Sequence, residues 1–283
     1  MKARYIFTKC FLGNLFIKLK NRYENCEDFI KILVYHNIPF EDLGRFYSQI
    51  KYIAEHYGFI EPDDFKEVII GQKQYKGIKV LLTFDDCFSS NTAVVEKILD
   101  PLGIKAFFFI PTGFIDALAR DEQRIFIARN IYNNRFEPQN IPDDMASMTW
   151  ADLEQLLKKG HTIGAHTINH CRLTEIENED ELRREITGSG DIIGEKLGIK
   201  INHFAFPFGG VNSVTKKAMD IIKERYKYCF SSIRGKNCIE TNSYALLRDP
   251  VSLNDPLEYV RFIIEDGLGF FYKKQSLLLA NIA

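Results

Sequence analysis

Two acidic residues and two histidines stand out in the sequence, because each pair follows a run of apolar residues. Asp85 and Asp86 come directly after the apolar run 80–84, and His166 and His170 follow another predicted strand. A strand buried on both faces has no use for a carboxylate pair, since an unpaired buried charge is costly. The pattern therefore predicts a metal ion, a catalytic base, or both at this point.

The spacing of the two histidines fits a single bound ion. Residues four apart can bind one ion from a helical turn or a tight loop. The metalloprotease motif H-E-x-x-H would need Glu where the sequence has Thr167, so a general base must come from elsewhere. The acid pair can supply both that base and a third ligand. Two histidines and one carboxylate leave a coordination position open, as catalytic metal sites do.

Each half of this pattern also has an ordinary explanation. An H-x-x-x-H spacing on a surface helix is more often chance than a metal site, and an Asp-Asp pair after a strand is usually a helix cap or a turn. Both together, each at the end of an apolar strand, favour a functional site.

The elements that must position these residues alternate between strands and helices. Strands are predicted over 30–38, 80–84, 105–110, 162–167, 203–208, 226–231 and 244–251. Helices are predicted over 40–57, 93–99, 149–159, 177–197, 214–225, 255–265 and 270–279, with one more starting near Ile115. Strands separated by helices imply right-handed crossovers and a parallel sheet, open or closed into a barrel.

The polar candidates fall at or near the carboxyl ends of the predicted strands. They are His36, Asp85, Asp86, His166, Asn169, His170 and Arg248. Barrel enzymes keep their chemistry at that end, so the pattern favours a barrel-like α/β fold over a doubly wound sheet.

Composition describes an ordinary globular chain. The 283 residues are 46% hydrophobic and 27% charged, with a net charge of −1, which argues against a nucleic-acid partner. Six scattered cysteines without a C-x-x-C motif indicate reduced thiols in a cytoplasmic protein. No apolar run reaches the roughly 18 residues of a spanning helix. With no visible linker or repeat, we expect one domain over residues 1–283.

Two segments are less regular than the rest. Residues 1–22 make a poor signal peptide, but they fit an amphipathic helix with basic flanks. Such a helix could lie on an anionic membrane surface or pack on the surface of the protein itself. Residues 114–148 contain a long polar loop, and loops of that length are usually functional lids or mobile segments.

Three motifs in order resemble a known family. Residues 83–86 (T-F-D-D), 166–170 (H-T-I-N-H) and 204–209 (F-A-F-P-F-G) are similar to the first three motifs of the NodB-homology polysaccharide deacetylases, carbohydrate esterase family 4. The likeness extends to residues 108–114 and 160–167. It covers about 30–252, which leaves an N-terminal segment at 1–29 and C-terminal helices at 253–283. It implies a distorted (β/α) barrel with about seven parallel strands.

The resemblance also implies roles for particular residues. Asp85 would be the general base, and Asp86, His166 and His170 would bind a divalent metal. The backbone N–H of Phe208 would help to hold the oxyanion. Zinc suits two histidines and a carboxylate with an open position, although cobalt or nickel would fit similar ligands.

The sequence departs from the family pattern at several positions. Cys87 stands where the family usually has Gly, so its thiol is a spectator, a stray ligand or an oxidation liability. Ala205 stands where an Arg usually orients the base. Arg248 is the candidate replacement, although a structural ion pair with Asp249 or another nearby acid explains it about as well.

The general acid is expected on the first strand. The family's usual Leu-x-His near the C-terminus is absent, but some members carry this histidine in a Tyr-His motif on the first strand, and residues 34–36 (V-Y-H) fit that permuted branch. His36 is then the candidate acid. Phe206, Pro207 and Asn169 are the candidate contacts to the sugar.

These features predict a metal-dependent N-deacetylase. Its substrate would be an N-acetylated sugar in a surface polysaccharide or its precursor, and its products acetate and a free amine. The expected location is the cytoplasm, where residues 1–22 could contact a membrane. Hydrolysis of another small amide, such as a formamide, and a catalytically silent carbohydrate-binding protein of the same fold are the alternatives.

Overall fold

The computed structural model describes residues 28–239 and 241–283. The predicted amphipathic helix at residues 1–22 lies outside the described residues, as does nearly all of the N-terminal segment 1–29. Within the described part of the chain, no helix is both long and apolar enough to cross a lipid bilayer.

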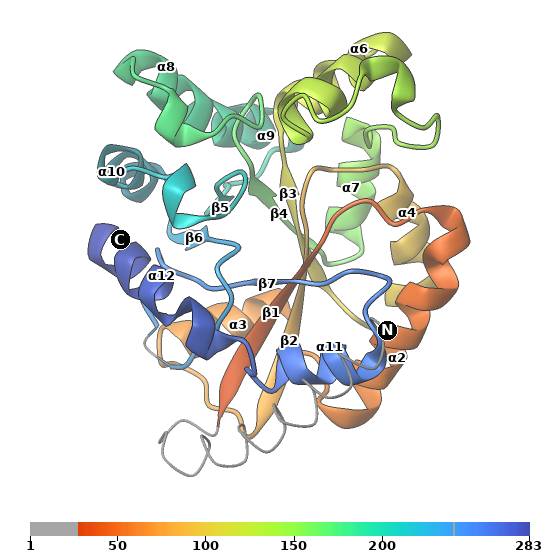
Figure 1. Ribbon diagram of the computed structural model, residues 1–283, viewed down its shortest axis with the longest axis vertical. Coiled ribbons are helices and arrows are strands. Elements are labelled where there is room, and N and C mark those ends of the chain that lie inside the picture. The colour runs from red at the N-terminus through yellow and green to blue at the C-terminus, as the bar shows by residue number, and fades with distance from the viewer. Residues whose placement is uncertain (1–27, 240) are drawn as a thin grey trace.

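Seven parallel strands form one sheet, in the order β6-β5-β4-β3-β2-β1-β7. They are β1 (Phe29–Tyr35), β2 (Ile78–Phe84), β3 (Ala106–Ile110), β4 (Thr162–Ala165), β5 (His203–Ala205), β6 (Tyr228–Phe230) and β7 (Asp249–Pro250). Figure 1 shows the strands at the centre of the molecule with helices around them. Continuous apolar runs such as Ala-Phe-Phe-Phe-Ile in β3 are typical of a sheet covered on both faces. All seven strands were predicted.

The sheet curls into a distorted barrel, and residues 244–251 bridge its two edges. Leu246 makes a parallel bridge to Phe230 of β6, and Asp249 and Pro250 then pair with β1. Within this segment only Asp249 and Pro250 form a strand, β7, because the chain crosses from one edge to the other instead of following either. The predicted (β/α) barrel is confirmed, with a shorter seventh strand than the sequence indicated.

Helices surround the sheet. They are α2 (Leu43–His56), α3 (Pro62–Ile69), α4 (Ser90–Val94), α5 (Thr112–Asp116), α6 (Arg120–Phe126), α7 (Trp150–Lys158), α8 (Glu179–Arg183), α9 (Ser189–Leu197), α10 (Lys216–Arg225), α11 (Leu257–Ile264) and α12 (Gly269–Ile282). Three π-helical turns, η2 (Val95–Leu99), η3 (Ile127–Ile131) and η6 (Arg184–Gly188), continue α4, α6 and α8. The predicted helix 177–197 is therefore α8, η6 and α9 in succession.

Two details of the helices correct or confirm the sequence analysis. Helix α3 was missed, although Pro62 at its first turn and the acidic residues after it are helix-start signals. Helix α7 begins as predicted, with a capping box: the Thr149 hydroxyl accepts from the Asp152 N–H at 3.2 Å, and the Asp152 carboxylate accepts from the Thr149 N–H at 2.8 Å.

The register of the strands aligns the residues that follow them. Tyr35 of β1 pairs with Phe84 of β2, so His36 and Asp85 leave the sheet at the same level. In the same way Ile110 pairs with Ala165, and the N–H of His166 donates to the Ile110 carbonyl at 3.0 Å. The loops at this end of the barrel therefore meet.

Candidate functional site

The two adjacent carboxylates separate as soon as β2 ends. The N–H of Asp85 still donates to the Tyr35 carbonyl of β1 at 3.0 Å, whereas Asp86 and Cys87 turn with φ values of 71° and 62°. Both acids are nearly inaccessible to solvent. Because Asp86 and Cys87 have left-handed backbone conformations, the chain reverses sharply, and the carboxylates of Asp85 and Asp86 point to different partners.

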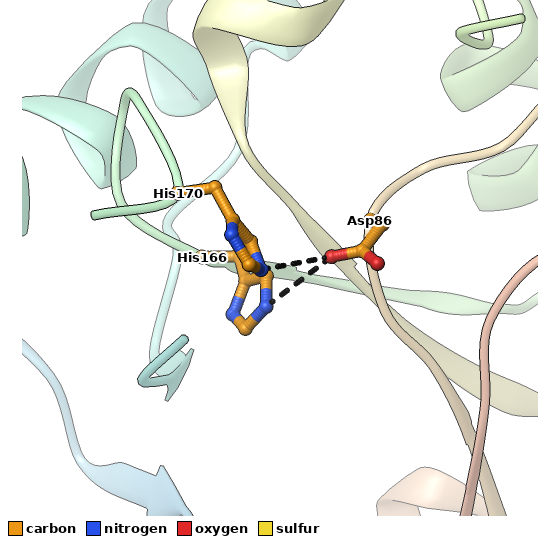
Figure 2. A group of neighbouring side chains, drawn as sticks. All are labelled: Asp86, His166 and His170. Carbon is orange, nitrogen blue, oxygen red and sulfur yellow. Dashed lines mark ion pairs between the residues drawn. The ribbon is translucent and has the colours of Figure 1, made fainter. Parts of the chain in front are cut away.

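Asp86 faces the two histidines. Its Oδ1 lies 3.1 Å from Nε2 of His170 and 3.6 Å from Nε2 of His166, and Figure 2 shows the three side chains pointing toward one another. The other ring nitrogen of each histidine is held by the backbone: Nδ1 of His166 lies 2.6 Å from the Ala205 carbonyl, and Nδ1 of His170 lies 2.9 Å from the Asn130 carbonyl. A carbonyl only accepts, so each Nδ1 carries the proton and each Nε2 is left toward Asp86.

The charges of this group fit a bound cation. Burial lowers the pKa of His166 to about 4, so its ring is neutral near pH 7. Burial would also lower the pKa of His170, but the negative charge of Asp86 outweighs burial, and the pKa of His170 is raised. Burial would raise the pKa of Asp86, but His170 outweighs burial, and the pKa of Asp86 is lowered. The Asp86 Oδ1 is buried and has no hydrogen-bond partner among the described residues. A proton shared with His170, or a metal ion, satisfies these converging acceptors.

Asp86, His166 and His170 are therefore a group that could hold a metal ion, with ligand atoms within 4.8 Å of one another. All three are buried, and each histidine has the backbone partner that fixes the ring of a metal-binding imidazole. The sequence named the same three residues.

Asp85 forms a two-pronged ion pair with Arg248. Each carboxylate oxygen lies 2.7 Å from a guanidinium nitrogen, and Arg248 is fully buried. Its Nε also donates to the Ser231 carbonyl at 2.7 Å. Burial would raise the pKa of Asp85, but Arg248, followed by His166, outweighs it and lowers the pKa. Arg248 thus contacts the predicted base, while Asp249 pairs with Lys31 at 2.7 Å.

A cavity of about 440 Å³ opens beside these groups. Its lining includes the predicted His36, Asp85, Asp86, His166, His170 and Phe208. His36 is exposed to solvent, unlike the buried Asp86, His166 and His170. Phe208 has a φ of 61° and its ring lies 5.0 Å from that of His170. Among the described residues no hydrogen bond from the Phe208 N–H is formed, so this donor is available to a ligand.

Five further residues line the cavity and were missed: Phe88, Ile131, Tyr132, Ser232 and Pro250. Ile131 and Tyr132 belong to the irregular segment 114–148, which folds into α5, α6 and η3 before the loop begins. Burial and the nearby Asp86 raise the pKa of Tyr132, so its hydroxyl stays protonated. The length of the segment suggested a functional role, but no local pattern marked these two residues.

Three predicted substrate contacts lie elsewhere and do not line the cavity. Phe206 is buried in the apolar core, and Pro207 is buried as well. The Asn169 side chain donates to Glu185 at 2.6 Å. The side chains of Phe206 and Pro207 are buried and the Asn169 amide donates to a carboxylate, so their contact with a sugar stays a prediction.

The prediction that all cysteines are reduced thiols holds for some of them and fails for one. Cys87 is buried, and burial strongly raises the pKa of its thiol, which lies near Ser147 and Met148 and is not part of the ligand group. Cys87, Cys171 and Cys229 are free, as expected. Cys238, however, is disulfide-bonded, so the expectation of reduced thiols fails at that position.

Fold and site together define a barrel protein in which three buried side chains that could hold a metal ion meet at the carboxyl ends of the strands. The family model for polysaccharide deacetylase matches residues 72–224, more than half of the chain, and the protein belongs to that family. The matched range contains the acid pair and both histidines. His36 and Arg248 lie outside it, so their place in the site rests on the structure.

Several known proteins are similar to this chain. YxkH of Bacillus subtilis (strain 168), named as a candidate polysaccharide deacetylase, is 22% identical over 229 residues, or 79% of this chain and 71% of YxkH. The Streptococcus pyogenes deacetylase PplD in complex with acetate has a TM-score of 0.65 at 20% identity, over 83% of this chain and 98% of PplD. IcaB from Ammonifex degensii has a TM-score of 0.66 at 18% sequence identity, over 84% of this chain and 97% of the IcaB chain. At these identities the solved structures show a shared fold.

Proposed function

We propose that this polysaccharide deacetylase removes an N-acetyl group from an amino sugar, in a surface polysaccharide or its precursor, with the help of a divalent metal. The observation that carries the proposal is the convergence of Asp86, His166 and His170 beside the ion-paired Asp85, at the edge of an open cavity. Acetate and a free amine would be the products.

Asp86, His166 and His170 would hold the metal. When bound, it would polarise the amide carbonyl and make a water molecule more acidic. Zinc is the first choice for this ligand set, with cobalt or nickel as alternatives. The remaining steps belong to side chains and backbone groups of the chain itself.

Asp85 would act as the general base. Arg248 keeps its carboxylate ionised and fixed, and one lone pair on each oxygen remains for an incoming proton. Asp85 Oδ2 lies 3.9 Å from His166 Nε2, so the base sits next to the ligand group. It would take the proton from water as the water attacks the acyl carbon.

The Phe208 N–H and His36 would complete the reaction. The free N–H of Phe208 would donate to the oxyanion that forms as the carbonyl carbon becomes tetrahedral. An amide nitrogen leaves poorly as an anion, so a proton must reach it, and His36 lines the same cavity from the end of β1. We further propose that residues 1–283 act as one domain, with the catalytic core at 30–252.

Elemental analysis of the purified protein tests the metal site. We expect about one equivalent of divalent metal in the wild type, and little in Asp86→Ala, His166→Ala and His170→Ala. Glu195→Ala, which changes an exposed residue of α9, is the control and should keep its metal. A wild-type protein that takes up neither zinc, cobalt nor nickel would overturn the proposal.

A substrate panel then separates the remaining possibilities. Acetate release from N-acetylated sugars supports the deacetylase, while cleavage of a formamide alone would favour another amide as substrate. Sugar binding without acetate release in the metal-loaded protein would favour a silent binding protein. The cytoplasmic location and the membrane contact of residues 1–22 stay predictions, which fractionation of the native protein would test.

A further inference from the structure

The loop between the two histidines is held in place by hydrogen bonds to a buried carboxylate, which has no role in the proposed reaction. Glu185 lies in η6 and its side chain is buried. Its Oε2 accepts from the backbone N–H groups of Ile168 at 3.0 Å and Asn169 at 2.8 Å, and its Oε1 accepts from the Asn169 side-chain amide at 2.6 Å. All three bonds therefore end on residues between His166 and His170.

These hydrogen bonds hold a loop whose backbone is strained. Thr167 and His170 have φ values of 62° and 52°, and neither is a glycine. Such residues are strained and persist only where their surroundings hold them. Turns of this kind point successive N–H groups to one side, which favours an anion there. In the part of the chain that the structure describes, no lysine or arginine forms an ion pair with Glu185.

A second contact fixes the other side of the same loop. Asn130 of η3 donates through Nδ2 to the Asn169 carbonyl at 2.7 Å, and its own carbonyl holds Nδ1 of His170 at 2.9 Å. Asn130 can hold the ring only if the loop stays in place, and Glu185 supplies three of the hydrogen bonds to that loop, beside one from the Gly113 N–H to the Ile168 carbonyl at 2.8 Å.

We propose that Glu185 is a positioning residue that fixes the 167–170 loop, keeps Nε2 of His166 and His170 aimed at Asp86, and thereby sets the affinity of the site for its cation. The inference rests on the proposed function, because it requires a cation there. Partners that orient metal ligands typically contribute about 10–100-fold to metal affinity.

Titration of the metal-free protein with Co²⁺, followed by visible absorption, tests this role. We expect Glu185→Gln, which keeps the size but removes the charge that three donors share, to bind Co²⁺ about 10–100-fold more weakly than the wild type. The matched control is Glu195→Gln on the exposed side of α9, which should bind as the wild type does. The thermal midpoint of each metal-free protein is measured alongside.

The outcomes separate this inference from the proposed function. If Glu185→Gln lowers the thermal midpoint but the folded protein keeps wild-type affinity, Glu185 is only structural and the inference fails alone. If the wild type binds no Co²⁺, both fail. Should Glu185→Gln not fold, Asn169→Ala decides, since it removes one of the three bonds and leaves Glu185 in place. Weaker Co²⁺ binding supports the inference, and unchanged binding overturns it.

Discussion

At the scale of single residues, the ion pair between Asp85 and Arg248 ties stability to chemistry. Both side chains are buried, and a buried carboxylate without a partner is strongly disfavoured. The pair holds Asp85 in its ionised form and in one orientation, which a general base needs. Arg248 comes from the segment that bridges β6 and β1, so closure of the barrel and orientation of the base depend on the same residue.

Replacing Arg248 by Leu should therefore harm both folding and activity. We expect the free energy of unfolding to fall by about 3–5 kcal/mol, because Asp85 is left buried and unpaired, and we expect kcat to fall as well. Urea unfolding and steady-state kinetics measure the two effects.

The control for this variant is Arg183→Leu. Arg183 pairs with Glu224 at 2.6 Å, a similar distance, but both side chains are exposed. Exposed pairs contribute little, so this variant should unfold almost as the wild type does. An equal fall in the free energy of unfolding in the two variants would show that burial does not make the Asp85–Arg248 pair more important for stability than an exposed pair.

The sequence predicted the acid pair, both histidines and His36 in the cavity lining, because strand ends place them there. The family resemblance matched Asp86 with the histidines and offered Arg248 for Asp85, but the sequence could not choose between that role and an ion pair of Arg248 with Asp249, since the choice depends on the turn at Asp86 and Cys87. Phe206 and Asn169, two of the candidate sugar contacts, do not line that cavity. Which way a side chain points after a strand depends on the turn that follows, and no sequence pattern fixed those turns.

At the scale of elements, the site is built from loops whose backbones are unusual. Of the eight non-glycine residues with positive φ in the described chain, five lie in the loops around the ligand group: Asp86, Cys87, Thr167, His170 and Phe208. Strain of this kind gathers where a surrounding fold holds it for function. The strands were predictable from apolar runs, whereas these loop conformations, and the helices within 114–148, come from tertiary contacts.

The helical part of that segment should affect substrate binding more than catalysis. Tyr132, just after η3, forms part of the cavity wall and is not a ligand of the site. We expect Tyr132→Ala to raise KM about tenfold, the equivalent of roughly 1.4 kcal/mol of lost contact, while kcat and metal content change little. Tyr132→Phe keeps the ring and should restore most of the binding. A fall in kcat with unchanged KM would instead place Tyr132 among the reacting groups.

At the scale of the whole molecule, the barrel encloses a histidine that opposes folding in acid. His203 of β5 is buried, its ring stacks at 5.1 Å on that of Tyr228, and within residues 28–239 and 241–283 its Nε2 has no hydrogen-bond partner. Burial, followed by the charge of Lys66, lowers its pKa to about 3 in the folded protein. The unfolded chain therefore binds a proton at this residue at a higher pH than the folded one does.

Stability should accordingly fall as the pH is lowered through this range. Below about pH 6.5, His203 removes roughly 1.4 kcal/mol of stability per pH unit, until the folded form is protonated too near pH 3. We expect His203→Phe to reduce this slope in the metal-free protein, with the difference between the two proteins reporting His203 alone. Urea unfolding from pH 7 to pH 4 measures it, and parallel curves would contradict this origin of acid sensitivity.

The most direct test of the proposed enzyme is acetate release from an N-acetylhexosamine oligomer by metal-loaded protein, with Asp85→Asn beside the wild type. Asp85→Asn keeps Asp86, His166 and His170, so both proteins should be compared at equal metal content. We expect steady acetate release by the wild type and a loss of at least about 100-fold in the variant, the usual contribution of a general base. A metal-loaded wild type that releases no acetate, or a variant as active as the wild type, would contradict the roles assigned to this site.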